Sequence, residues 1–198
     1  MKRYIIVGVV AVLVFFAGVQ FGVSYFSDVA KSTGNEVSTG NFDIGISKDG
    51  KRFYDDYKLF SFNDVAPGEN RTFTFYVKNR GDYPVSSISL LFNTTDLEDG
   101  QLSKAEALVD STPEVGELSK YLTIKDFRVE FNGTETVLND YIGKTLREVN
   151  MSELNIFNGS LKPDEQIKVT ITIGLSPSAG NDCLTDSADV ELIITASQ

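Results

Sequence analysis

The sequence contains no histidine and no tryptophan, and Cys183 is its single cysteine. One cysteine excludes a disulfide within the chain, so Cys183 either crosslinks to another molecule or stays a buried, inert thiol. Without histidine the chain lacks the commonest general base and the commonest transition-metal ligand, which argues against zinc chemistry and against a Ser-His-Asp or Cys-His arrangement. We therefore expect a protein that is not an enzyme and that needs no cofactor.

Basic residues are also few. The chain has 18 Lys and Arg against 28 Asp and Glu, a formal net charge of −10. A surface that binds a nucleic-acid duplex neutralises phosphates with clustered Lys and Arg, and no such cluster is present. Nucleic acid is therefore excluded as a partner, and the acidic surface indicates a solubilising role.

The first residues form a membrane-directed segment. Met1-Lys2-Arg3 is a short positive head, and an uncharged run over 4–27 follows it. Gly22-Val23-Ser24 offers the small residues that a signal peptidase needs, which predicts a signal peptide over 1–24 and cleavage before Tyr25. The alternative is a retained transmembrane helix, because about 20 apolar residues span a bilayer. With cleavage, the protein meets the membrane only during export.

The remainder predicts an N-terminal segment over 25–37 and one β-domain over 38–198, and the polar, glycine-containing stretch 31–40 at their junction favours a flexible connection. Alternating apolar and polar residues, the pattern of half-buried strands, recur along the chain. An edge strand or ordered loop over 53–62, a short helix over 104–109 and a helical piece over 141–149 are also expected. Because the alternation weakens there, we interpret 94–160 as a helix-containing insertion carried by the sheet. The predicted strands cover 42–46, 71–78, 85–92, 124–131, 167–173 and 189–196.

Many strands with little helix favour an all-β fold, a β-sandwich of jelly-roll type. The apolar faces of its strands are the candidates for an inner groove. They comprise Phe73, Phe75, Val77, Ile88, Leu90, Val169, Ile171, Val190 and Leu192.

Several short motifs, taken in order, resemble the TasA/camelysin group of secreted matrix and filament proteins. The stretches 25–28 and 38–44 are similar to that group's mature start, and Ala66-Pro67-Gly68-Glu69 followed by Asn79-Arg80-Gly81 is similar to its "P-G-D…N-x-G" core. The closing stretch 181–198 matches the group's last motif at Asn181, Ser187, Ala196 and Gln198. The closing stretch departs from the group's motif at Leu184-Thr185, where Gln-Gly is expected. The range 94–160 has no pattern that matches the group.

The resemblance implies an extracellular subunit that polymerises with copies of itself. In that group the N-terminal segment of one jelly-roll subunit completes the sheet of the next, which satisfies unpaired backbone groups and fills an apolar groove. The segment 25–37 would be the donor strand, and Tyr25, Phe26, Val29 and Val37 would be its anchors. The same segment could instead be a disordered leader.

Five Asn-x-Ser/Thr sequons indicate an extracellular surface, and each of them falls at a predicted strand end, a turn or the insertion. They are headed by Asn70, Asn93, Asn132, Asn150 and Asn158. The Asn-Gly pairs at Asn132 and Asn158 are equally explained as turn residues.

Acidic clusters raise the question of a Ca²⁺ site. Asp96, Glu98 and Asp99 lie beside Gly100, and Asp55 and Asp56 form a second group. Neither group has the spacing of a known calcium loop, so solvated acidic turns are the interpretation that we favour.

Two further function classes remain open. A type IV pilin or archaellin-like subunit would retain the apolar helix, although Lys2-Arg3-Tyr4 lacks the small residue expected at its processing site. A membrane-anchored β-sandwich could instead serve as a binding domain. An enzyme is disfavoured, although the camelysin name is attached to a protease, because no HExxH motif exists.

Overall fold

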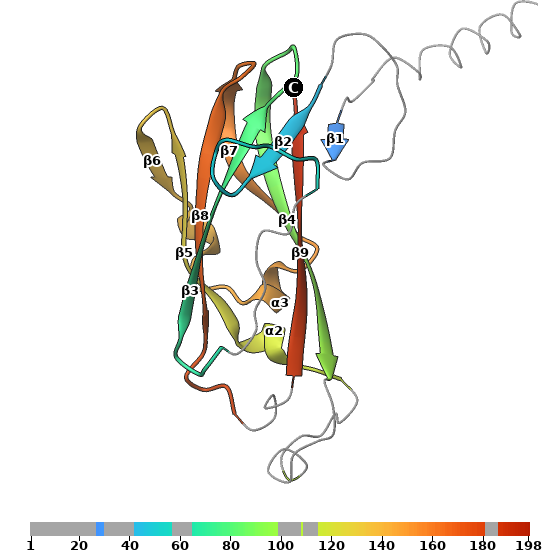
Figure 1. Ribbon diagram of the computed structural model, residues 1–198. Helices are drawn as coiled ribbons and strands as arrows, with labels where there is room; N and C mark the ends of the chain where they lie inside the picture. Colours follow the sequence, from blue (N-terminus) through green and yellow to red (C-terminus); the bar gives the residue numbers. More distant parts are fainter. Residues whose placement is uncertain (1–26, 30–41, 57–64, 99–107, 109–114, 181–185) are drawn as a thin grey trace, which may run out of the picture.

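The protein is a sandwich of two antiparallel β-sheets (Figure 1). The computed structural model describes residues 27–29, 42–56, 65–98, 108, 115–180 and 186–198. One sheet has four strands and the other has five. The strands are β1 (Ser27–Val29), β2 (Ile44–Ser47), β3 (Asn70–Asn79), β4 (Val85–Glu98), β5 (Leu122–Phe131), β6 (Thr134–Val137), β7 (Glu153–Leu161), β8 (Gln166–Leu175) and β9 (Asp186–Ser197).

The strand order is that of a jelly roll. The four-stranded sheet runs β1-β9-β4-β7 and the five-stranded sheet runs β2-β3-β8-β5-β6. Apart from the β5–β6 hairpin, each connection from β3 onward passes from one sheet to the other, as in a pair of Greek keys. The predicted all-β jelly-roll sandwich is therefore confirmed, with β2 as an additional edge strand and β1 in the place of the first strand.

Side-chain alternation explains why the longest strands form. In β8 the residues Ile167, Val169, Ile171 and Ile173 are all fully buried, and the residues between them are less so. Their β-branched side chains fit a pleated, half-buried surface. The strands predicted from the same period over 71–78, 85–92, 124–131, 167–173 and 189–196 all lie within β3, β4, β5, β8 and β9.

The predicted insertion over 94–160 is part of the sandwich. It does contain short helices: α2 (Leu118–Tyr121), the 3-10 helix η3 (Asn139–Tyr141) and α3 (Leu146–Val149). The same range, however, also supplies β5, β6, β7 and the end of β4, which are members of the two sheets. The sequence analysis missed β6 because both faces of this strand are exposed, so its residues do not alternate between apolar and polar. It missed β7 because the pairing of β7 with β4 contains bulges, which interrupt the alternation.

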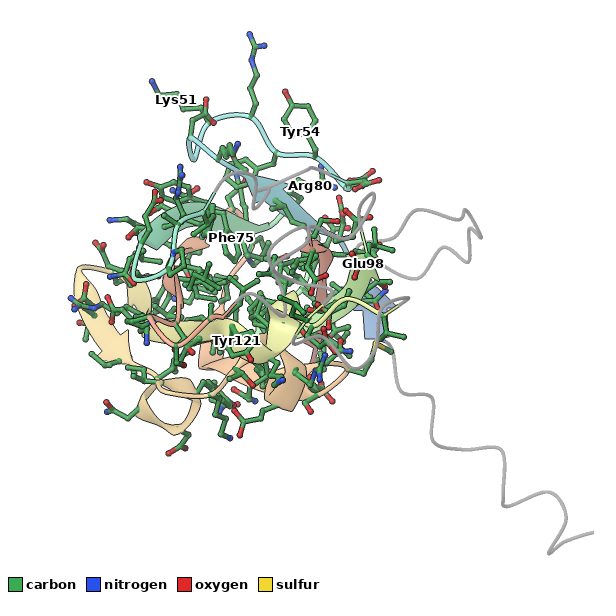
Figure 2. The ribbon with its side chains drawn as sticks, turned by 90° about the horizontal axis from the view of Figure 1, so that it is seen from below. Lys51, Tyr54, Phe75, Arg80, Glu98 and Tyr121 are labelled. Carbon is green, nitrogen blue, oxygen red and sulfur yellow. The ribbon has the colours of Figure 1, made fainter. Side chains whose placement is uncertain are left out.

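The core lies between the two sheets. Its largest fully buried side chains include Phe75, Phe92 and Phe127, and each contributes about 1.5–3 kcal/mol through burial. Figure 2 shows Phe75 in the interior, while Lys51 and Tyr54 project outward from the loop after β2. In the range predicted as an edge strand or loop over 53–62, Tyr54 makes an isolated bridge with Ile46.

The turn after β3 is fastened by a buried amide. The side chain of Asn79 is fully buried, and its nitrogen donates to the carbonyl oxygens of Tyr83 (2.8 Å) and Leu161 (2.9 Å). Its oxygen accepts the Gly81 N–H at 2.9 Å. One side chain thus joins the β3–β4 connection to the end of β7, which holds the two sheets in register at this end.

Helices α2 and α3 close the other end of the sandwich (Figure 1). Thr145 and Glu148 form a capping box that starts α3, and the side chains of its first and last residues, Leu146 and Val149, are buried. This is the helical part of the piece predicted over 141–149.

Several predictions fall outside the described residues: the signal peptide 1–24, Tyr25, Phe26, Val37, Asp99, Cys183 and, Leu108 apart, the helix over 104–109. Within the described ranges, no helix has the length and apolar character needed to cross a bilayer.

Candidate assembly edge

The candidate site is the outer edge of β9. On one side β9 pairs with β4 along its whole length, from Ser87 opposite Ser197 to Glu98 opposite Asp186. On the other side it pairs with β1 over three positions, Ser27–Ser197, Asp28–Ala196 and Val29–Thr195. Figure 1 shows this short β1 beside the end of β9 that carries the C-terminus.

The rest of this edge, from Asp186 to Ile194, pairs with no other described strand. At about 3.3 Å per residue these nine residues offer about 30 Å of strand edge. An edge of this kind presents a row of backbone N–H and C=O groups, and it is a template for a further strand.

Burial varies along the core face of β9. The side chains at positions 188, 190, 192, 194 and 196 alternate toward the core. Ala196, Ile194 and Ala188 are buried, with 2%, 0% and 8% exposed, whereas Val190 and Leu192 between them are only partly buried, although they also pack against the core. Two apolar side chains on the core face of the unpaired edge are therefore incompletely covered.

The residues predicted to line a groove divide into two groups. Phe75, Val77, Ile88, Leu90, Val169 and Ile171 are fully buried in the chain's own core. Phe73, Val190 and Leu192 are partly buried and pack at its margin. The structure thus brings Val190 and Leu192 to the unpaired edge of β9. Of the donor anchors, Val29 lies in β1.

Sequence reasoning identified β9 as a strand but not as the open edge. The feature that marks the open edge is a mismatch in length, because β9 has 12 residues and β1, in the place of its outer partner, has three. Local patterns do not reveal which strands become neighbours, so the mismatch is visible only after the topology is known.

Carboxylates meet at the lower end of this edge. Glu98 lies opposite Asp186 in the β4–β9 ladder, and the backbone N–H of Glu117 donates to Asp186 at 2.5 Å. Partial burial raises the pKa of Asp186 to about 7, helped by the nearby Glu98 and Glu117 carboxylates and opposed by the Glu117 N–H bond. Gly116 allows the chain to pass here, because a Cβ at this position would lie 2.6 Å from the Leu97 carbonyl oxygen.

Of the acidic residues considered as Ca²⁺ ligands, Asp96 and Asp55 have protein partners. Asp96 accepts from the Ser119 backbone N–H (2.7 Å) and hydroxyl (2.5 Å) and pairs with Arg147 at 3.0 Å. Asp55 pairs with Arg80, and Asp56 is exposed. Within the described part of the chain, no three His, Cys, Asp or Glu side chains are grouped so that they could hold a metal ion.

Comparisons with known proteins add little. No protein-family model and no curated protein matches this chain. A solved structure of a "putative secreted protein" from Eubacterium rectale aligns with 87% of this chain and 39% of that one, at 11% identity and a TM-score of 0.35. The chain therefore spans about two fifths of that protein's length. A likeness this weak supports no conclusion about function or location.

Proposed function

We propose that this protein is an extracellular structural subunit, which polymerises when the N-terminal strand of one copy pairs with the β9 edge of the next. The observation that carries the proposal is the three-residue β1 beside a twelve-residue β9. A longer strand from a neighbour would pair with the backbone from Asp186 to Ile194 and cover Val190 and Leu192. The motifs shared with the TasA/camelysin group support the same mechanism.

The energies favour a donor longer than β1. Each backbone hydrogen bond contributes about 0.5–1.5 kcal/mol net, so three paired positions contribute only a few kcal/mol. Association costs about 4–15 kcal/mol. A donor that pairs with most of the edge and buries one aromatic anchor, worth about 1.5–3 kcal/mol, reaches that range. In the register of β1, the residues after Val29 would continue along the unpaired edge, and Tyr25 and Phe26, directly before β1, would be anchors at the end of β9 that carries the C-terminus.

The N-terminal strand is joined to the domain through residues 30–41. In the register of β1, residues 30–38 would continue along the neighbour's edge from Ile194 to Asp186, and residues 39–41 would connect the donated strand to Phe42. Head-to-tail donation does not close on itself, so it builds a filament. The mechanism requires no catalyst and no cofactor.

The first test determines the N-terminal residue of the protein from its own cells. A start at Tyr25 supports strand donation. A start near Tyr4 indicates a pilin-like subunit, and an intact Met1 indicates a membrane-anchored binding domain. Either of the last two results contradicts the proposal.

The second test removes the donor. Protein that begins at Ser38 should be a folded monomer by circular dichroism and analytical ultracentrifugation, and a peptide of residues 25–37 should bind it. The mature protein should form filaments under the same conditions. Filaments of unchanged width and helical repeat from the truncated protein would show that donation is the wrong mechanism.

Two neighbouring substitutions test the acceptor edge in the mature protein. Leu192→Ser changes a side chain on the core face of β9, and Ile193→Ser changes its neighbour on the outer face. We expect the first to weaken peptide binding and filament growth at least tenfold more than the second. Equal effects would place the donor elsewhere.

A further inference from the structure

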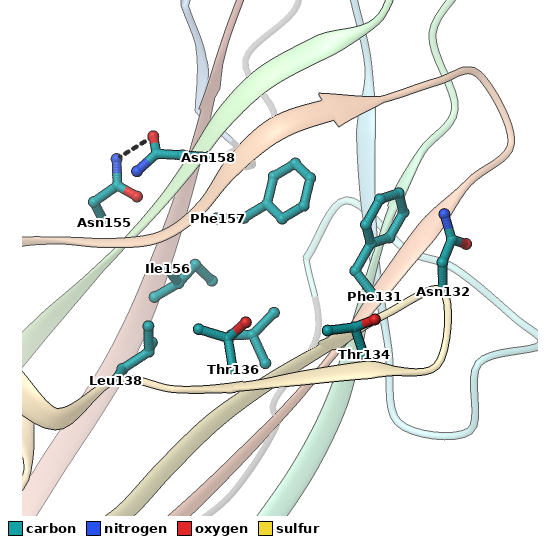
Figure 3. Close-up of a pocket in the computed structure, with 10 residues that line it drawn as sticks. Phe131, Asn132, Thr134, Thr136, Leu138, Asn155, Ile156, Phe157 and Asn158 are labelled. Atoms are coloured by element: carbon teal, nitrogen blue, oxygen red, sulfur yellow. Dashed lines mark hydrogen bonds between the residues drawn. The ribbon is translucent and has the colours of Figure 1, made fainter.

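A pocket lies at the opposite edge of the sandwich from β1, between the β5–β6 hairpin and β7 (Figure 3). Its volume is about 520 Å³. The lining combines apolar side chains, among them Phe131, Ile156 and Phe157, with uncharged polar ones, among them Asn132 and Thr134. No charged side chain lines it, so the pocket suits a neutral ligand with both apolar and hydrogen-bonding faces.

Two copies of the same short sequence motif contribute side chains to the lining of this pocket. Residues 131–134 read Phe-Asn-Gly-Thr and residues 157–160 read Phe-Asn-Gly-Ser, and each is a sequon preceded by phenylalanine. The structure brings the two phenylalanines together, since the rings of Phe131 and Phe157 meet edge to face with centroids 5.2 Å apart. Two of the five sequons therefore converge on one aromatic surface.

The other three sequons differ. The side-chain amide of Asn150 is fully used in hydrogen bonds to the backbone of Thr94. Its nitrogen donates to the Thr94 carbonyl (3.1 Å) and its oxygen accepts the Thr94 N–H (2.8 Å). Asn93 donates to Glu191 at 3.0 Å on the sheet surface. Asn70 is exposed at the start of β3, away from the pocket.

Asn132 is the best placed of the five. With φ of 50° at Asn132 and 76° at Gly133, it occupies the tight β5–β6 hairpin turn, a conformation that Asn-Gly favours. Phe131 and Thr134 face each other across the hairpin. Figure 3 shows the exposed Asn132 amide beside the Phe131 ring, whereas Asn158 turns toward Asn155, from which it accepts a 3.0 Å hydrogen bond.

We propose that Asn132 carries an N-linked glycan whose first sugar occupies this pocket. The C–H groups on one face of a pyranose pack against the aromatic rings, and its hydroxyls meet the polar rim at Thr134 and Thr136. The tight turn keeps the attachment point close to Phe131, so the sugar is positioned without a long, flexible link.

The modification needs a sugar donor and an enzyme from the exporting cell. The Asn132 side-chain nitrogen attacks the anomeric carbon of a lipid-linked oligosaccharide phosphate or diphosphate. The bond between that carbon and the phosphate oxygen breaks, the N–C bond forms, the amide loses one proton, and the lipid phosphate leaves. The inference thus rests on the extracellular location in the proposed function, but not on strand donation.

The test uses the mature protein purified from its own cells. Glycopeptide mapping should find sugar on Asn132 and none on Asn150. Bare Asn132 would overturn the inference. Filament formation, followed by electron microscopy of the same samples, reports separately on strand donation.

A double-mutant cycle of Tm values tests whether the sugar occupies the pocket. Loss of the glycan through Asn132→Asp, which keeps a residue type suited to the positive φ of this turn, should lower Tm by about 2–4 °C in the native background. The same change should have little effect when Phe131→Leu, or independently Phe157→Leu, is already present. Occupancy of Asn132 is checked in each background. An equal loss of Tm in all three backgrounds would show that the sugar does not use the pocket.

Discussion

Replacement of Asn79 by alanine tests how the two sheets are held together at the end of the molecule near β1. The change removes two donated hydrogen bonds and one accepted bond, all of 2.8–2.9 Å, from a fully buried site. At about 0.5–1.5 kcal/mol for each bond, we expect a loss of about 1.5–4.5 kcal/mol in the free energy of unfolding. At about 2–4 °C per kcal/mol, Tm should fall by about 3–18 °C.

Urea and thermal unfolding followed by circular dichroism measure this loss. Asn155→Ala is the matched control, because it removes an exposed amide hydrogen bond and should cost less than about 0.5 kcal/mol. Asn79→Asp separates the roles of the two amide atoms, since it keeps the acceptor for Gly81 and loses both donors. If Asn79→Ala is as stable as Asn155→Ala, the turn does not depend on this amide and the reasoning is refuted.

Two other changes probe the lower end of the sandwich. The pKa of Asp186 is raised from 3.8 to about 7, so its stabilising contribution is complete below pH 4 and is lost as the pH rises through 7. Asp186→Asn should therefore raise Tm at pH 8 and leave it nearly unchanged at pH 4; parallel Tm profiles of the two proteins from pH 4 to 8 would contradict this. Thr145→Ala should cost about 1 kcal/mol in urea unfolding, because the capping box with Glu148 is lost. A cost below about 0.3 kcal/mol would mean that the cap contributes little.

Strands with strict alternation could be predicted from sequence. In β3 and β8 every second side chain is apolar, and the registers pair Phe73 with Ile171 and Phe75 with Val169. The period of two is a local property, so these strands were predicted without knowledge of their neighbours. β7 could not be predicted this way, because the β4–β7 register shifts between Ile88 and Ser89 and the period is broken.

The candidate site depends on long-range pairing, which no local pattern specifies. The sequence indicated that Val190 and Leu192 share a face, and the structure places them on the core side of β9. That this strand lies beside the short β1 follows from the sheet order alone. For the same reason, the contact between Phe131 and Phe157 could not be foreseen from two separate Phe-Asn-Gly motifs.

Crosslinking across the β1–β9 pair tests the central claim most directly. Val29 lies opposite Thr195, and opposed Cα atoms in an antiparallel pair are about 4.5–5.5 Å apart, which suits a disulfide. Cys183→Ser removes the native thiol first. One protein then carries Val29→Cys and a second carries Thr195→Cys, and the two are mixed, allowed to assemble and oxidised.

Strand donation between subunits predicts that filaments of the mixed proteins yield a disulfide-linked dimer with one copy of each protein. Protein that begins at Ser38 lacks the donor strand and should give no such dimer. A single chain that carries both substitutions should then give linear multimers on a denaturing gel. If that chain forms only an internal disulfide within filaments, and the mixed pair forms no dimer, β1 stays with its own subunit and the account is contradicted.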